Sequence, residues 1–148
     1  MQIALFGDRF ASHCDQREIA WPDLCTYLSN PPEYPSKEAC PLIKLAAFGS
    51  TPTPKGSLRH DANVLHISGV EGDHDSGQIA PGVAAQMLQA AGVAGIVYTT
   101  ASHRPEFPRW RVLVPVSQNY PVTARWELVS RLNNIFKGTF AAESFALS

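Results

Sequence analysis

The stretch RWRVLVPV, residues 109–116, decides the fold that the sequence predicts. Its apolar side chains recur at every second position: Trp110, Val112, Val114 and Val116. Because side chains two apart in a strand point to the same face of a sheet, these four are expected to face a core covered by helices. Arg109 and Arg111 alternate with them and are expected on the opposite, open face.

The sequence on either side of this strand predicts an alternation of strands and helices. Pro81 and Pro121 suit the first turn of a helix, and Gly92 and Gly138 suit the position just after its end. The predicted core elements are a strand at 64–68, a helix at 81–91, a strand at 95–100, the strand at 109–116 and a helix at 121–137. The side chains expected to hold the two helices on the sheet are Val83, Met87, Leu88, Ala91, Trp126, Val129, Leu132 and Phe136.

The resulting order, β-α-β-β-α, predicts an α+β fold with helices on one sheet face, as in ferredoxin-like or RRM-like modules. We expect residues 61–148 to form this core and residues 1–60 to form an N-terminal flank of the same domain. Seven of the 12 prolines lie between Pro22 and Pro54, so the flank is expected to be rich in loops. The elements expected in this Pro-rich α/β flank are strands at 2–6 and 44–48 and a helix at 22–28.

Length and composition narrow the possible functions. A chain of 148 residues has the size of one domain. With 45% apolar and 17% charged residues, it is too apolar to be disordered. Lysine and arginine total 12 against 13 acidic residues, a net charge of -1. This balance excludes a generally basic nucleic-acid coat, but it leaves open an enzyme whose active groove alone is charged.

The chain is also expected to be cytoplasmic and to make no membrane contact. No segment approaches the about 18 uninterrupted apolar residues of a membrane helix, and the N-terminal sequence lacks the features of a signal peptide. Cys14, Cys25 and Cys40 are an odd number without a close pair, which is typical of free thiols in a reducing compartment. A zinc cluster of the three with His13 or His60 is the alternative.

An acidic cluster follows the strand at 64–68. In an extended chain, Asp73 and Asp75 lie about 7 Å apart at Cα on one face. Two carboxylates so placed repel each other unless a cation compensates, and they suit Mg²⁺ or Mn²⁺ with coordination positions left open for phosphates. Glu71 shares this face if the strand continues that far. The alternative is a polar turn without a metal.

A hydroxyl, an imidazole and several arginines follow the next strand. Ser102 and His103 come at the end of the strand at 95–100, where such groups can bind phosphate oxygens. An exposed loop is the alternative for His103. Five arginines lie between His103 and residue 131, and guanidinium groups bind phosphates with two parallel hydrogen bonds. Arg109 and Arg111 are the strongest candidates because they alternate with core residues.

Three blocks of the sequence together resemble the primase/polymerase domain of the archaeo-eukaryotic primase superfamily, in particular its phage- and plasmid-borne replication proteins. The blocks are NVLHISGVEGDHDSG (63–77), VYTTASHRPEFPRWRVLVPVS (97–117) and RLNNIFKGTFAAESFALS (131–148). The superfamily's D-x-D motif matches Asp73 and Asp75, and its small-residue-x-His motif matches Ser102 and His103. The PRWR segment that ends at Arg111 is a further match.

This resemblance implies template-directed primer synthesis from nucleoside triphosphates with two divalent ions. Asp73 and Asp75 would ligate Mg²⁺ or Mn²⁺, Ser102 and His103 would hold the triphosphate, and arginines 109 and 111 would assist. The partners implied are nucleoside triphosphates, a single-stranded DNA template and a replicative helicase.

The sequence departs from the family's pattern at its third acidic position. Glu143 is the only acid near that place, so we assign it there as a further metal ligand and expect the core to be truncated at its C-terminus. Whether this chain is an active enzyme is left open. The alternatives are a non-catalytic RRM-like module that binds nucleic acid or a partner, and a metal-dependent nuclease.

Overall fold

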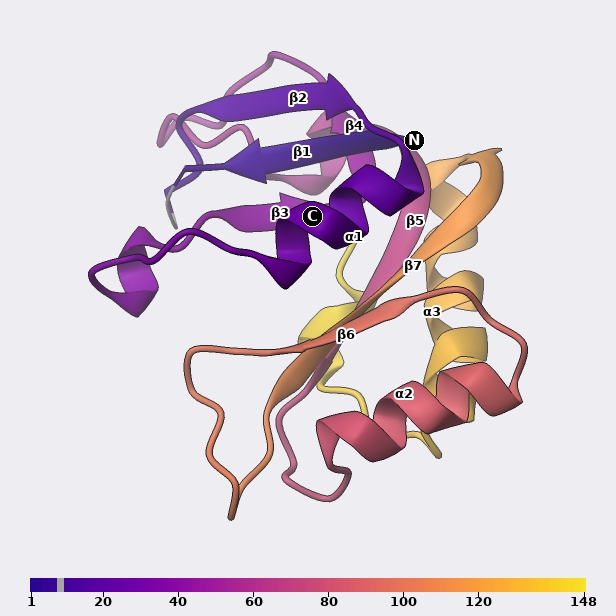
Figure 1. Ribbon diagram of the computed structural model, residues 1–148. Coiled ribbons are helices and arrows are strands. Elements are labelled where there is room, and N and C mark those ends of the chain that lie inside the picture. The colour runs from indigo at the N-terminus through magenta and orange to yellow at the C-terminus, as the bar shows by residue number, and fades with distance from the viewer. Residues whose placement is uncertain (8–9) are drawn as a thin grey trace. The chain divides into compact units, whose positions relative to one another are not determined.

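The computed structural model describes residues 1–7 and 10–148. Within those residues the chain forms three α-helices and two antiparallel sheets, which confirms the α+β class (Figure 1). The chain divides into two compact units. The first comprises Met1–Gly69, Ser117–Val122 and Leu147–Ser148, and the second comprises Val70–Val116 and Thr123–Ala146. No helix among the described residues is long and apolar enough to cross a membrane.

The first unit contains a three-stranded sheet in the order β2-β1-β3. Its strands are β1 (Gln2–Phe6), β2 (Cys14–Glu18) and β3 (Leu42–Lys44), and helix α1 covers Trp21–Ser29. The predicted strand at 2–6 and helix at 22–28 are thus confirmed. The strand predicted at 44–48 is confirmed over β4 (Ala46–Phe48), but its start is wrong, because Lys44 is the last residue of β3 and β4 belongs to the other sheet. Between them, the Leu45 carbonyl accepts hydrogen bonds from two backbone amides of β5.

The second sheet has the strand order β4-β5-β7-β6. The core elements follow one another in the predicted sequence: β5 (Val64–His74), α2 (Pro81–Ala90), β6 (Ile96–Thr99), β7 (Trp110–Tyr120) and α3 (Arg125–Ile135). The long strands β5 and β7 each contribute residues to both units. Gly92 and Gly138 follow the two helices with φ of 66° and 77°, the left-handed conformation expected of a residue that ends a helix.

Three predicted boundaries of the core elements are wrong, and the first is the end of the strand predicted at 109–116, which continues to Tyr120 as β7. The strand predicted at 64–68 continues to His74, so the acidic cluster lies within the sheet rather than in a turn after it. Tertiary packing overrides the low strand propensity of Gly and Asp here. The helix predicted at 121–137 begins as a short 3₁₀ helix, Val122–Ala124, and is α-helical only over Arg125–Ile135.

The helices of the second unit pack on the predicted face of β7. Trp110 and Val112 are fully buried there, together with residues from both helices. The buried cluster comprises Val70, Ala84, Leu88, Trp110, Val112, Val114, Val129, Leu132, Phe136 and Phe140. The opposite face is not as open as predicted, because Leu113 is also fully buried.

Three side chains predicted for this core, Val83, Ala91 and Trp126, lie outside it because they are exposed. Trp126 is 68% exposed and Val83 is 49% exposed. In α3 the buried positions are 125, 129 and 132, so Arg125 takes the inward position and Trp126 lies about 100° around the helix. In α2 the buried pair is Ala84 and Leu88, which places Val83 on the neighbouring face.

Candidate functional site

Asp73 and Arg111 form a two-point ion pair between neighbouring strands. The Nε of Arg111 lies 2.6 Å from Oδ1 of Asp73, and its Nη2 lies 2.9 Å from Oδ2. Both side chains are about a quarter exposed. Burial by itself lowers the pKa of Arg111, but the hydrogen bond to Asp73 and the nearby Tyr98 and Glu71 raise it by more. The predicted metal ligand and the predicted phosphate-binding arginine are therefore paired with each other.

Tyr98 extends this row across a third strand. It lies on β6 directly opposite Arg111 in the β6–β7 register. Burial raises the pKa of Tyr98, and the adjacent guanidinium of Arg111 counteracts part of that rise. Asp73, Arg111 and Tyr98 thus form a polar row over β5, β7 and β6. The alternation of residues in the sequence only weakly indicated that Tyr98 belongs to this row. It does not fix which residue of the neighbouring strand lies opposite Arg111.

Glu71 is buried and ion-paired elsewhere. Its Oε2 lies 2.9 Å from Nη1 of Arg125, and the two side chains are 6% and 4% exposed. Arg125 also donates to the carbonyl of Ala146 from Nε (2.6 Å) and to that of Ser144 from Nη2 (3.0 Å). Glu71 therefore joins β5 to the start of α3 and to the C-terminal segment.

His74 lies between the two predicted metal ligands, but it faces the core. Its ring stacks on Trp110 with centroids 4.6 Å apart. The backbone amide of Ile79 donates to Nε2, so Nδ1 carries the proton and faces the hydroxyl of Thr139. Burial lowers the pKa of this imidazole. His74 thereby fixes the turn that follows Asp75 onto the core.

The remaining predicted metal ligands, Asp75 and Glu143, are both exposed. Asp75 directly follows the last residue of β5, and Glu143 lies in the 3₁₀ helix Ala142–Phe145. The segment of Glu143 is attached to Asp73 by two hydrogen bonds: the backbone N–H of Asp73 donates to the Ser144 hydroxyl (2.9 Å), and the Asp73 carbonyl accepts from the backbone N–H of Ala141 (2.8 Å). Among the described residues, no three His, Cys, Asp or Glu side chains gather as a metal-binding group.

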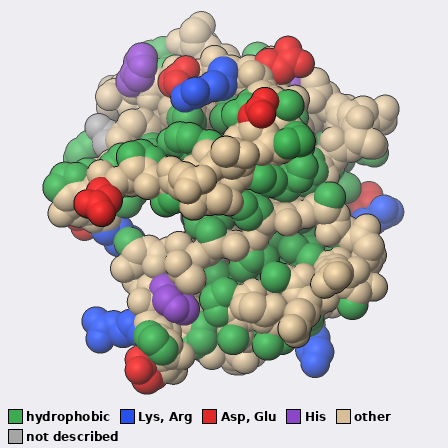
Figure 2. Space-filling view, in the orientation of Figure 1, with side chains coloured by type: hydrophobic (Ala, Val, Ile, Leu, Met, Phe, Trp, Pro, Cys, Tyr) green, Lys and Arg blue, Asp and Glu red, His purple; other side chains and the backbone are tan. Residues whose placement is uncertain are grey.

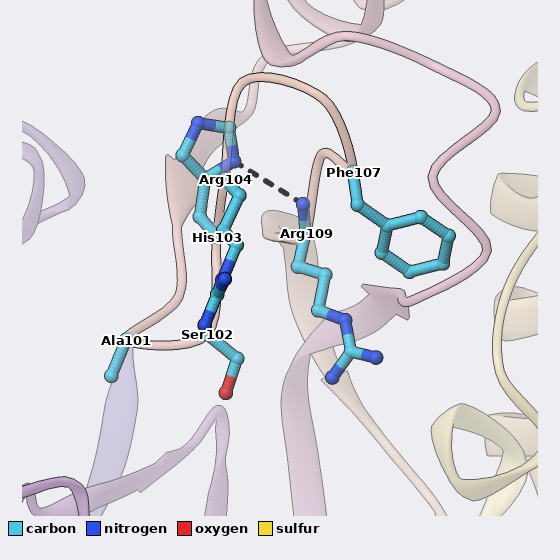
Figure 3. A pocket seen from close by; sticks show the side chains of 6 residues that line it. All are labelled: Ala101, Ser102, His103, Arg104, Phe107 and Arg109. Carbon is cyan, nitrogen blue, oxygen red and sulfur yellow. Dashed lines mark hydrogen bonds between the residues drawn. The ribbon is translucent and has the colours of Figure 1, made fainter.

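A polar pocket of about 370 Å³ lies in the loop between β6 and β7 (Figure 3). Its lining residues are Ala101, Ser102, His103, Arg104, Phe107 and Arg109. Nδ1 of His103 accepts from the backbone amide of Arg109 at 3.2 Å, so in the neutral ring Nε2 carries the proton and can donate. The guanidinium of Arg109 lies over the Phe107 ring, 5.2 Å from its centroid.

The loop has a folded framework of its own. Arg104 and Phe107 pair as an isolated antiparallel bridge, and the Thr100 amide donates to the Arg109 carbonyl at 3.1 Å. In Figure 3 the side chains of Ser102, Arg104 and Arg109 extend in the same direction from the loop. In this region Figure 2 shows a histidine and a basic side chain at the surface, with an acidic side chain beside them. The prediction named Ser102, His103 and Arg109 for the nucleotide, and the structure adds Arg104 to the same pocket.

The acidic strand end and this pocket are neighbours. A Cβ added at Gly77 would lie 2.7 Å from Cδ2 of Phe107, so the turn two residues after Asp75 packs directly on the pocket wall. Arg111, which holds Asp73, comes two residues after Arg109 in the chain. The pocket thus contains three of the predicted residues, Ser102, His103 and Arg109. Arg111, two residues further along the chain, is paired with Asp73, whereas Glu71 is paired with Arg125.

Comparisons with known proteins give no match: no family model, no curated protein and no solved structure resembles the chain significantly.

Proposed function

We propose that this chain binds a nucleoside triphosphate with a divalent cation and performs template-directed nucleotidyl transfer, as its resemblance to the archaeo-eukaryotic primase superfamily implies. One observation carries the proposal: the turn that follows the acidic strand end packs on Phe107, in the wall of a pocket lined by hydroxyl, imidazole and guanidinium groups. Carboxylates for a cation and donors for phosphates are thereby neighbours, as the reaction needs.

The strand order supports the RRM-like half of the superfamily fold. In β5-α2-β6-β7-α3 the third strand, β7, lies between the first two. This split arrangement, with a helix crossing between β5 and β6, is that of ferredoxin-like modules. It brings the end of β5 and the loop after β6 beside the same stretch of β7.

The pocket has the donors that a triphosphate requires. Arg104 and Arg109 offer guanidinium groups, which bind phosphate oxygens with short, charge-assisted hydrogen bonds. The Ser102 hydroxyl and the Nε2–H of His103 supply directed hydrogen bonds. Because His103 also accepts from the Arg109 amide, it fixes the backbone of one of the two arginines.

The carboxylates fit a magnesium-type ion. Mg²⁺ is usually held by one or two carboxylates together with substrate phosphates and waters, so Asp73 and Asp75 suffice without a third protein ligand. When bound, the divalent ions would neutralise charge on the attacking and leaving oxygens. A primer hydroxyl bonds to the α-phosphorus and gives its proton to water, while the bond to the β-phosphate breaks and pyrophosphate leaves. The chain's own groups orient the triphosphate for this in-line attack.

Calorimetry with Mn²⁺ and dATP, followed by primer synthesis on single-stranded DNA, tests the proposal. Arg104→Ala and Arg109→Ala should each weaken dATP binding about 10- to 100-fold, the value of a charge-assisted hydrogen bond of roughly 1.5–3 kcal/mol. In the double variant Asp73→Ala/Asp75→Ala, the binding of dATP should no longer depend on Mn²⁺. Arg131→Ala is the matched control, since that arginine is exposed and paired with Glu127 in α3.

Two results would contradict the proposal. If calorimetry detects no heat of binding with Mn²⁺ and dATP together, the chain has no nucleotide site of the proposed kind. Tight binding of single-stranded DNA without nucleotide binding or synthesis would instead favour a non-catalytic nucleic-acid-binding module.

A further inference from the structure

We propose that Arg111 is an internal counter-ion that competes with the metal for Asp73, so that binding of the metal and of the triphosphate depend on each other. This inference rests on the proposed nucleotide site. It assigns Arg111 a positioning role: the residue holds the carboxylate in the absence of ligands and moves to the triphosphate when both ligands arrive.

The ion pair already occupies Asp73. Two nitrogens of the planar guanidinium meet the two carboxylate oxygens at 2.6 and 2.9 Å, so each oxygen has a charged donor. A divalent ion that approached the same oxygens would meet a positive charge held against them. Since like charges at this range repel strongly in a partly buried site, the metal binds well only if Arg111 leaves.

The surroundings limit where Arg111 can go. Glu71, the next carboxylate on β5, is already paired with the buried Arg125 at 2.9 Å. On its other side Arg111 meets the phenol of Tyr98, which is a much weaker partner than an anion. Arg109 is two residues away in the chain and lines the pocket, so a triphosphate bound there offers anionic oxygens next to Arg111. The phosphates thus replace Asp73 as the partner of Arg111.

Coupling of this kind is reciprocal. If the triphosphate raises the affinity for the metal by some factor, the metal raises the affinity for the triphosphate by the same factor. The metal alone should bind weakly to the wild-type chain. Removing the charge of Arg111 should strengthen binding of the metal alone, whereas a purely structural arginine would leave that affinity unchanged or lower it.

The test measures Mn²⁺ binding by the loss of its free electron-paramagnetic-resonance signal, without nucleotide, for the wild-type chain and for Arg111→Met. We expect the variant to bind Mn²⁺ at least tenfold more tightly. The affinity for dATP is then measured with and without Mn²⁺ in both proteins. The ratio of the two affinities should be several-fold smaller in the variant, and the formation of Mn²⁺–dATP in solution contributes equally to both.

A second variant and a control keep the test decisive. Arg111→Lys retains a charge but cannot contact both oxygens in parallel, so it should strengthen Mn²⁺ binding by a smaller factor than Arg111→Met. Arg131→Met should behave as wild type. If the wild-type chain binds dATP with Mn²⁺ but neither Arg111 variant binds Mn²⁺ alone more tightly, the counter-ion role is refuted and the nucleotide site stands. If the wild-type chain binds neither ligand in any combination, the nucleotide site itself fails, and this inference with it.

Discussion

The buried pair of Glu71 and Arg125 gives the sharpest stability prediction. Replacing Arg125 with Met preserves much of the side-chain volume but leaves the carboxylate of Glu71 buried without its partner at 2.9 Å. Removing one member of a buried ion pair costs about 3–5 kcal/mol. The variant also loses the hydrogen bonds to the Ser144 and Ala146 carbonyls. Water can reach the exposed Ala146, which recovers part of that loss. We expect Arg125→Met to lower the free energy of unfolding by about 4 kcal/mol, a large share of the roughly 5–15 kcal/mol of a typical domain.

A double-mutant cycle isolates the ion pair. Glu71→Gln removes the charge that Arg125→Met leaves unpaired, so the double variant should be about 2 kcal/mol more stable than the sum of the single changes predicts. Urea unfolding followed by tryptophan fluorescence measures all four proteins. Arg131→Met, which breaks the exposed pair with Glu127, is the matched control and should change stability by less than about 0.5 kcal/mol. A loss below about 1 kcal/mol in Arg125→Met, or additive single changes, would refute the reasoning.

Two further predictions concern the core side of β5. Burial lowers the pKa of His74, so below about pH 6.5 the unfolded chain binds a proton there that the folded chain does not, and stability should fall as the pH falls. The urea midpoint should therefore depend less on pH between 5 and 7.5 in His74→Gln, and an unchanged slope would contradict this. Gly72→Ala would force a Cβ into the Phe140 ring and should cost about 1–3 kcal/mol in urea unfolding. Gly82→Ala is the control, because a Cβ at this position of α2 meets open space. It should stabilise the protein by less than about 1 kcal/mol. Equal effects of the two changes would argue against the Phe140 contact.

Local sequence rules were sufficient for the class and order of the core elements. Alternation in residues 110–116 correctly predicted which side of β7 carries Trp110 and Val112. Proline at 81 and glycine at 92 correctly marked the two ends of α2, because both act through the backbone of their own turn. The ends of the strands predicted at 44–48 and 64–68 were misplaced because they depend on pairing with strands elsewhere in the chain, which local rules do not contain.

The pairing of charges could not be predicted from sequence. Asp73 and Arg111 are 38 residues apart, and which side chains meet across two strands follows from the register. The same limit explains the error at Trp126. Apolar periodicity favoured the tryptophan for the core, but the inward position belongs to Arg125, whose guanidinium meets a carboxylate buried in the neighbouring strand.

The acidic segment is best understood as two interleaved patterns. Gly72 and His74 face the helices, where Phe140 leaves no room for a side chain at one position and Trp110 stacks on the ring at the other. Glu71 and Asp73 alternate with them, and each carries its own arginine. The two ion pairs differ in exposure: Glu71 is sealed in with Arg125, whereas Asp73 and Arg111 are about a quarter exposed beside the pocket. Solvent therefore reaches the second pair but not the first, a difference that the spacing of the acids does not reveal.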